Sequence, residues 1–255
     1  MTIVALLALS GALYGWGLLR MRAARRPFPR RATVAFGCAL AVAAAVSLGP
    51  LDDLADASLA WHMVQHLALV LLVAPLVLLG APLRLALGAL PPNRAAVLAR
   101  VLNSTPVRVL TNPGVAWVQF VLLLYGTHFS PLYEAALENQ TVHACEHALY
   151  LTSALVFWTP VLAVAPAPHA PPHAARILML FLALPASAFL GFAFYVGKHV
   201  LYAHYAVHPG ALDDQIAGGA VMWMAGGTPL LVALLWCIAD WGAREQRLAA
   251  ISDEG

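Results

Sequence analysis

Two histidine pairs with the same four-residue spacing are the clearest chemical signal in this sequence. His62 and His66 lie in WHMVQH, and His143 and His147 lie in VHACEH. Residues four apart on an α-helix are neighbours on one face, so each pair points two imidazole rings in the same direction. Imidazole nitrogens bind zinc, copper, iron and nickel. The spacing therefore predicts a metal site built from His62, His66, His143 and His147.

Several residues near these pairs could bind the metal or orient its ligands. Glu146 shares a helical face with His143 and His147, whereas Cys145 lies about 200° around the helix from His143 and is left out of the ligand set. A thioether at Met222 would suit Cu(I), although packing is the commoner role of methionine. The candidates for the supporting role are Glu146, His128, Met222, Asp214 and His204.

Both pairs lie in segments that are long and apolar enough to cross a bilayer. The chain is 62% hydrophobic and 10% charged, with a mean hydropathy of +0.79, and about 20 apolar residues span the hydrocarbon core. The predicted fold is all-α, a polytopic membrane helix bundle that forms one domain over residues 1–255. Seven transmembrane helices are predicted, at about residues 2–19, 32–49, 59–80, 113–128, 142–164, 175–197 and 214–240.

The basic residues predict how the bundle is oriented. Six arginines follow the first span, and positive residues in short loops stay on the cytoplasmic side. The amino terminus is then outside and the carboxyl terminus cytoplasmic, and all basic residues except Lys198 lie on the inner side. On this topology most acidic residues and all histidines except His169 and His173 lie in the outer half. The predicted localisation is a bacterial cytoplasmic (inner) membrane.

Three further features concern processing and connections. The first span has no basic residue before it, so we expect a retained helix rather than a signal peptide. The cysteines Cys38, Cys145 and Cys237 lie in three different spans, which gives no disulfide framework. The largest connection, residues 81–112, contains either a short interfacial helix or an ordered loop, and residues 165–173 form a proline-rich turn.

Four ordered motifs resemble a known family, the CtaG-like cytochrome c oxidase assembly factors. The motifs are WHMVQHLALVLLVAPLVLLGAPL at 61–83, THFSPLYEAAL at 127–137, VHACEHALYLTSALVFWTPVL at 142–162 and DDQIAGGAVMWMAGG at 213–227. The resemblance implies a membrane copper chaperone or assembly factor, not an enzyme, that delivers Cu(I) to cytochrome c oxidase. The two histidine pairs are the residues carried over.

The same resemblance implies the partners of the protein. These are the copper-bearing subunit of cytochrome c oxidase and a periplasmic copper donor, in addition to membrane lipid. The sequence gives no sign of nucleic-acid binding, and homo-oligomerisation is left open.

Histidines alone leave three alternatives open. A membrane di-iron oxygenase or desaturase also uses His-x-x-x-His boxes, although its further HxxHH boxes are absent from this sequence. A b-haem electron carrier ligates iron with histidines from two helices. In a purely structural role, the imidazoles would only form hydrogen bonds between helices.

Overall fold

The computed structural model describes residues 3–164, 166 and 171–253, and within these ranges it contains helices and no strand. The predicted all-α fold is confirmed. The helices are α1 (Ile3–Ala23), α2 (Arg30–Ser47), α3 (Pro50–Ala57), α4 (Leu59–Ala68), the π-helix η1 (Leu69–Val73), α5 (Ala74–Leu79), α6 (Pro82–Ala89), α7 (Pro92–Leu102), α8 (Thr105–Leu110), α9 (Pro113–His128), α10 (Pro131–Glu138), α11 (Gln140–Leu162), α12 (His173–Tyr195), α13 (Ala203–Ala206) and α14 (Ala211–Asp253).

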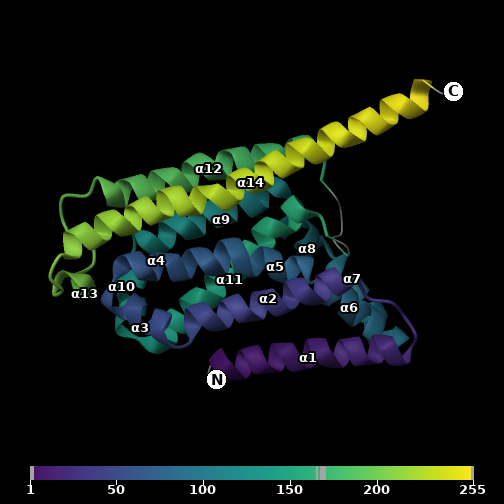
Figure 1. The fold of residues 1–255 in the computed structure, drawn as a ribbon, viewed down its shortest axis with the longest axis horizontal. Helices are drawn as coiled ribbons and strands as arrows, with labels where there is room; N and C mark the ends of the chain where they lie inside the picture. The colour runs from purple at the N-terminus through teal and green to yellow at the C-terminus, as the bar shows by residue number, and fades with distance from the viewer. Residues whose placement is uncertain (1–2, 165, 167–170, 254–255) are drawn as a thin grey trace.

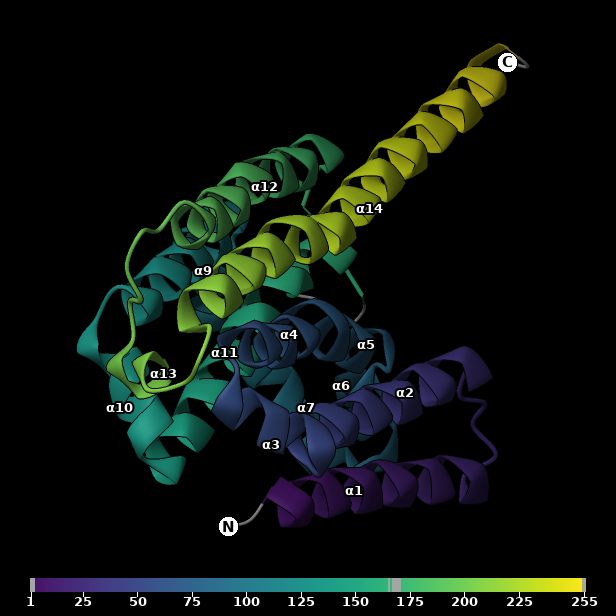
Figure 2. The same cartoon turned by 60° about the vertical axis from the view of Figure 1, so that its left-hand side comes forward.

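The long helices run back and forth between two ends of an elongated bundle (Figure 1). One end carries α3, α10 and α13, and we call it the acidic end because these elements and the start of α14 bring most of the aspartates and glutamates. The opposite end carries α6, α7 and α8 together with the α1–α2 connection. The carboxyl-terminal part of α14 projects beyond that opposite end, as Figure 2 also shows.

Within the described residues, five helical stretches are long and apolar enough to cross a membrane: α1, α2, the stretch Leu59–Ala89, α12 and α14. Together, α9 and α10 would make a sixth span, bent by 65° between its two parts. The segments predicted at 113–128 and 142–164 correspond to α9 and α11. Helix α11 is not among the five because the polar and charged side chains of its first two turns lower its mean hydropathy. By length and composition, the described residues therefore contain five spans, or six with the bent pair, and the predicted number of seven is not confirmed.

Two predicted boundaries are corrected by the structure. The last helix was expected at 214–240, but α14 runs over Ala211–Asp253 without a break. The connection at 81–112 forms three short helices rather than one, and in α7 the side chains of Val97 and Val101 are exposed, as an interfacial helix requires. The predicted turn at 165–173 lies partly outside the described residues.

Small polar residues fix where the helices of the bundle centre begin. Ser58 caps α4 by accepting a hydrogen bond from the backbone N–H of Trp61, and Asn139 caps α11 by accepting from the N–H groups of Thr141 and Val142. Such side chains satisfy amide groups that the first turn of a helix leaves without a partner. The caps therefore set the starting points of the two helices that carry the histidine pairs.

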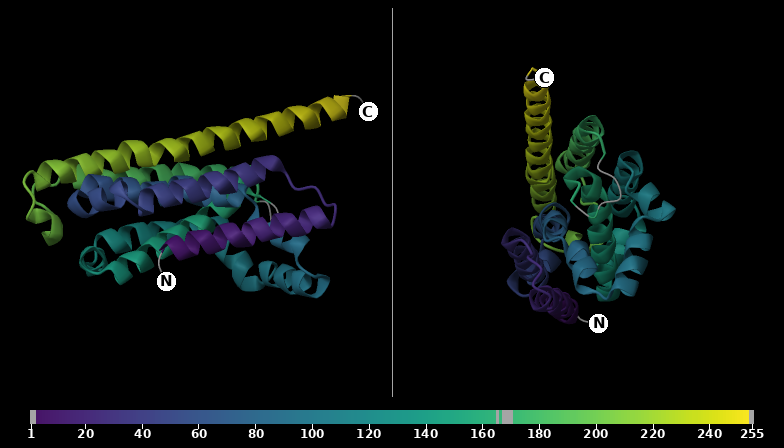
Figure 3. Two further views of the ribbon diagram at one scale, coloured as in Figure 1. Left: turned by 60° about the horizontal axis from the view of Figure 1, so that its bottom comes forward. Right: turned by 90° about the vertical axis from the view of Figure 1, so that its right-hand side faces the viewer.

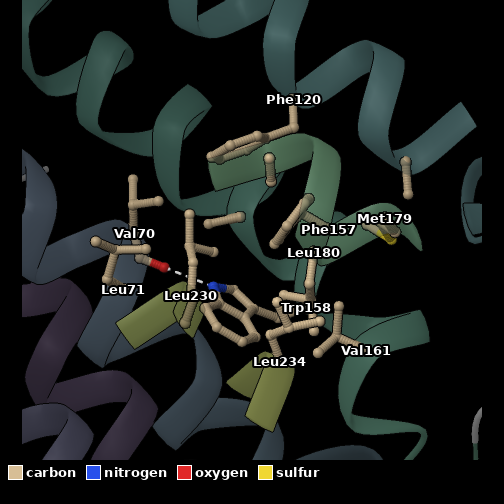
Figure 4. Close-up of a cluster of buried hydrophobic side chains, with 14 of the residues drawn as sticks. Val70, Leu71, Phe120, Phe157, Trp158, Val161, Met179, Leu180, Leu230 and Leu234 are labelled. Carbon is tan, nitrogen blue, oxygen red and sulfur yellow. Dashed lines mark hydrogen bonds between the residues drawn. The ribbon is translucent and has the colours of Figure 1, made fainter. Parts of the chain in front are cut away.

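A π-helix in the third predicted span accommodates Pro75. In η1 the N–H of Ala74 bonds to the carbonyl of Leu69, five residues back. The carbonyl of Val70 would bond to residue 75 in the same pattern, but proline has no N–H. The indole Nε1 of Trp158 on α11 donates to that carbonyl over 2.9 Å instead (Figure 4). This bond joins α11 to the stretch that follows the first histidine pair.

Replacing Trp158 with phenylalanine is expected to lower the free energy of unfolding by about 1–3 kcal/mol, because a buried carbonyl loses its donor. Thermal or denaturant unfolding in detergent measures the change. Trp117→Phe is the matched control, since the indole nitrogen of Trp117 is buried and has no hydrogen-bond partner among the described residues. Equal destabilisation by the two variants would contradict the assignment.

The two helices α12 and α14 pack at backbone distance. A Cβ atom added to Gly219 would lie 2.6 Å from the carbonyl oxygen of Gly191, and one added to Gly191 would lie 2.7 Å from that of Gly219. Small residues allow membrane helices to approach this closely. The end-on view in Figure 3 shows α14 beside α12, with α1 and α2 at the edge of the bundle. Tight packing of α14 therefore holds one wall of the bundle centre.

Candidate metal centre

The four paired histidines converge at one point between α4 and α11. One ring nitrogen from each of His62, His66, His143 and His147 lies within 4.8 Å of the others. The Nε2 atoms of His62 and His66 are 3.0 Å apart, and the ring centroids of His66 and His147 are 5.0 Å apart. The predicted convergence of the two pairs is found in the structure.

The local sequence explains why the two pairs meet at the same depth. His62 and His66 follow the capping residue Ser58 by four and eight positions, and His143 and His147 follow Asn139 by the same intervals. Both helices begin at the acidic end and run into the bundle in the same direction (Figure 1). His62 and His143 therefore lie at the same depth, one turn from the helix starts, and His66 and His147 lie one turn deeper.

The hydrogen bonds of His62 fix which of its nitrogens carries the proton. The hydroxyl of Tyr205 on α13 donates to the carbonyl of Ala55, which can only accept, over 2.9 Å. The contact of 3.0 Å between Tyr205 and His62 Nδ1 then has Nδ1 as the donor. His62 consequently presents the lone pair of Nε2 toward the cluster, which is the form that binds metals.

Burial keeps the hydroxyl of Tyr205 protonated, so that it can donate to Ala55. The phenol lies outside the long helices, and desolvation raises its pKa above the ordinary value, with the nearby carboxylates of Asp56 and Asp214 adding to the shift. The hydroxyl therefore stays protonated, and its proton remains available to Ala55.

The spacing of the nitrogens suits a single small cation. Imidazole nitrogens bind zinc at about 2.0–2.1 Å, which places two nitrogens of a tetrahedral site about 3.3 Å apart. The His62–His66 separation of 3.0 Å is close to this value, and the full spread of 4.8 Å is somewhat wider. His143 Nε2 and His147 Nε2 are buried without a hydrogen-bond partner in the described part of the chain. These two ring nitrogens lack a partner that a bound cation or a water molecule would supply.

Glu146 adds a negative charge beside the cluster. Its carboxylate is buried, and Oε2 lies 3.9 Å from His66 Nε2. Neither oxygen has a hydrogen-bond partner among the residues that the structure describes. A buried carboxylate without a partner is costly, and a neighbouring cation offsets that cost. Its position agrees with the charge-balancing role predicted for it.

His128 and Met222 lie next to the cluster rather than in it. Both side chains are buried and line a cavity of about 40 Å³ that His66 also borders. Met63, between the two histidines of α4, lines the same cavity and was not among the predicted candidates.

Asp214 and His204 have structural partners of their own. Asp214 Oδ2 accepts from the backbone N–H of Leu59 over 2.6 Å, and Oδ1 accepts from the Ser58 hydroxyl. This carboxylate therefore stabilises the first turn of α4, as negative charge at a helix N-terminus does. His204 is engaged elsewhere rather than at the cluster. Its Nε2 donates to the carbonyl of Asp56, and its backbone N–H donates to the carboxylate of Glu134.

The remaining histidines and Cys145 lie away from the cluster. Cys145 is exposed, as its place on the helix predicts. His199 and His208 are exposed at the acidic end, and His173 pairs with Asp240 at the opposite end over 2.9 Å. His169 lies outside the described residues.

Sequence analysis missed a group of buried tyrosines around the histidines. Tyr133 lies with its ring centroid 5.3 Å from those of His62 and His128, and Tyr150 lies 4.7 Å from His66. Tyr150 follows His147 by three positions, a spacing that places it on the same helical face and could have revealed it. Tyr133 and Tyr205 come from separate elements, so only the fold brings them near.

Comparison with known proteins identifies the family. Residues 12–244 match the family described as cytochrome c oxidase caa3 assembly factor (Caa3_CtaG). The chain belongs to this family. The predicted resemblance is thereby confirmed over nearly the whole chain, and an assembly factor agrees with the predicted non-enzymatic function. No solved structure shows significant similarity to the chain.

The similar curated proteins are much longer than this chain. An uncharacterised protein of Mycobacterium leprae is 27% identical over 258 residues, which covers 95% of this chain and 39% of that protein. An uncharacterised protein of Mycobacterium bovis is 26% identical over 256 residues, covering 95% of this chain and 38% of the relative. This caa3 assembly factor homologue thus spans about two fifths of the length of these relatives.

Proposed function

We propose that this protein is a membrane copper chaperone that holds one Cu(I) ion at the four-histidine cluster and delivers it to cytochrome c oxidase during assembly. The observation that carries the proposal is the convergence of four imidazoles from α4 and α11. One nitrogen of each ring lies within 4.8 Å of the others, in a member of an oxidase assembly family. Cu(I) accepts imidazole ligands and soft donors, and the ion is cargo that has to leave again.

In the proposed topology the seven helical segments all cross a bacterial cytoplasmic membrane, with the amino terminus and the acidic end outside. The positive-inside rule supports this orientation, because the arginines gather at the opposite end. A periplasmic donor would then supply the ion at the acidic end, and the copper-bearing oxidase subunit would receive it within the membrane.

His143 is the side chain through which an ion would reach the cluster. It is half-buried, whereas His62, His66 and His147 are buried. The acidic residues of α3 and α10 surround this end and would raise the local concentration of cations. The ion would therefore meet His143 first and then the deeper nitrogens.

The geometry disfavours the alternative metal centres. A bis-histidine haem needs space for a macrocycle between its ligands, and typical ligand pockets measure about 300–1,000 Å³. The cavity beside the cluster is about 40 Å³. A histidine-box di-iron centre of the desaturase type uses further HxxHH boxes, and this sequence contains none.

Copper titration of the purified protein tests the proposal. With an anaerobic Cu(I) chelator as competitor, we expect the four-histidine cluster to take up one Cu(I) per chain, and we expect the double variant His62→Ala/His143→Ala to lose that ion. The variant removes one imidazole from each helix and leaves two of the four ligands, so the affinity for the ion should fall steeply enough for the chelator to take it. Iron retained in place of copper, or unchanged Cu(I) binding by the variant, would overturn the proposal.

The control for this titration keeps the number of histidines equal. His199→Ala/His208→Ala removes two exposed imidazoles from the same end of the bundle. This variant should bind Cu(I) at the cluster as the wild type does.

A further inference from the structure

A small cavity lies directly below the four-histidine cluster. It is bordered by His66 and Met63 of α4, His128 of α9 and Met222 of α14, and its volume is about 40 Å³. A cavity needs about 10–15 Å³ to hold one water molecule, so this one accepts a single ion or a few waters. Val70 and Leu71 also line it. The cavity therefore extends from the cluster deeper into the bundle.

One ring nitrogen of His128 carries a lone pair that has no hydrogen-bond partner among the described residues. Its Nδ1 lies 2.7 Å from the carbonyl of Leu124, which can only accept, so Nδ1 carries the proton. The other nitrogen, Nε2, consequently bears the lone pair. It is buried and has no hydrogen-bond partner within the described ranges. Because His128 is only 5% exposed, water cannot satisfy this acceptor, and leaving it without a partner costs free energy.

Two thioethers border the same space. Met63 is 1% exposed and Met222 is 4% exposed, and they come from two different helices, α4 and α14. Thioether sulfur and imidazole together favour Cu(I) over hard cations such as Mg²⁺ or Ca²⁺, which require oxygen ligands. The lining is otherwise largely apolar, which suits a monovalent ion better than a divalent one.

We infer that this cavity is a second Cu(I) site, in which His128 Nε2 and the thioethers of Met63 and Met222 receive the ion from the four-histidine cluster. The inference rests on the proposed function. His66 borders both sites, so it can remain a ligand while the other imidazoles are exchanged for sulfur. The copper stays Cu(I) throughout, and no electron or proton donor is needed for the exchange.

The test is a titration with Cu(I), and separately with redox-inert Ag(I), combined with X-ray absorption spectroscopy of the loaded protein. Wild-type protein should bind two ions per chain, the first with nitrogen neighbours and the second with sulfur neighbours. Met63→Leu/Met222→Leu should bind one ion and lose the sulfur signal. Met179→Leu is the control, because Met179 is equally buried but lies in a different cluster.

The outcomes separate the two proposals. One ion with nitrogen neighbours alone, in both wild type and the methionine variant, overturns the second site and leaves the chaperone function standing. An ion with sulfur neighbours that survives in His143→Ala/His147→Ala supports the second site. If the His143→Ala/His147→Ala variant binds as many ions as wild type, the four-histidine cluster is not a copper site and the proposed function is overturned instead. Should the methionine double variant not fold, absence of sulfur neighbours in the loaded wild type is itself enough to refute the second site.

Discussion

A cell whose copy of this protein carries His66→Ala and His147→Ala is expected to lose cytochrome c oxidase activity to the level of a deletion strain when copper is scarce. The two imidazoles come from different helices, and their ring centroids lie 5.0 Å apart. Loss of an outer-shell partner alone costs about 10–100-fold in metal affinity. Loss of two ligands should lower the metal affinity by more than about 100-fold, so the variant should hold little copper when copper is scarce.

Oxidase activity and the copper content of the purified oxidase are the two measurements. Added copper should partly restore both, because free copper ions can then reach the oxidase without the four-histidine cluster. His199→Ala/His208→Ala is the control, and immunoblotting establishes equal amounts of each variant in the membrane. Normal oxidase activity at low copper with the cluster variant present would contradict the delivery function.

A single methyl group added at Gly219 of α14 is expected to destabilise the fold by forcing α12 and α14 apart. In Gly219→Ala the new Cβ would lie 2.5 Å from the backbone nitrogen of Tyr195 and 2.6 Å from the carbonyl oxygen of Gly191. Backbone atoms cannot rotate away as a side chain can, so α12 and α14 must separate. Overpacking of this kind costs about 1–3 kcal/mol or more.

The matched control lies two turns further along the same helix. A Cβ on Gly227 would meet nothing closer than Leu184 Cδ2 at 4.0 Å. Gly227→Ala should therefore leave the unfolding temperature in detergent unchanged or slightly raised, because alanine favours helix. Equal behaviour of Gly219→Ala and Gly227→Ala would show that the close α12–α14 contact does not limit stability.

The two halves of the four-histidine cluster were predictable because helix geometry is local. A spacing of four residues places two side chains on one face whatever the surrounding fold, so His62/His66 and His143/His147 were correctly paired. The same argument placed Glu146 toward the cluster and Cys145 away from it. Capping residues four positions ahead of each pair set the depth, although that regularity is visible only once the helix starts are known.

Residues that reach the site from other helices could not be assigned in this way. Asp214 was a candidate for the metal, yet it stabilises the first turn of α4, because the choice between these roles depends on which helix end lies beside it. Tyr205 was missed for the same reason, since its contact with His62 joins positions 143 residues apart.

The sequence by itself determined the apolar helices, the histidine pairs and the family motifs, since these follow from periodicity and composition along neighbouring residues. Only the tertiary structure decided that α4 and α11 begin at the same end and bring all four imidazoles together. It also decided that His128 and Met222 face a cavity below the cluster. Packing between distant helices sets such distances, and no local pattern encodes them.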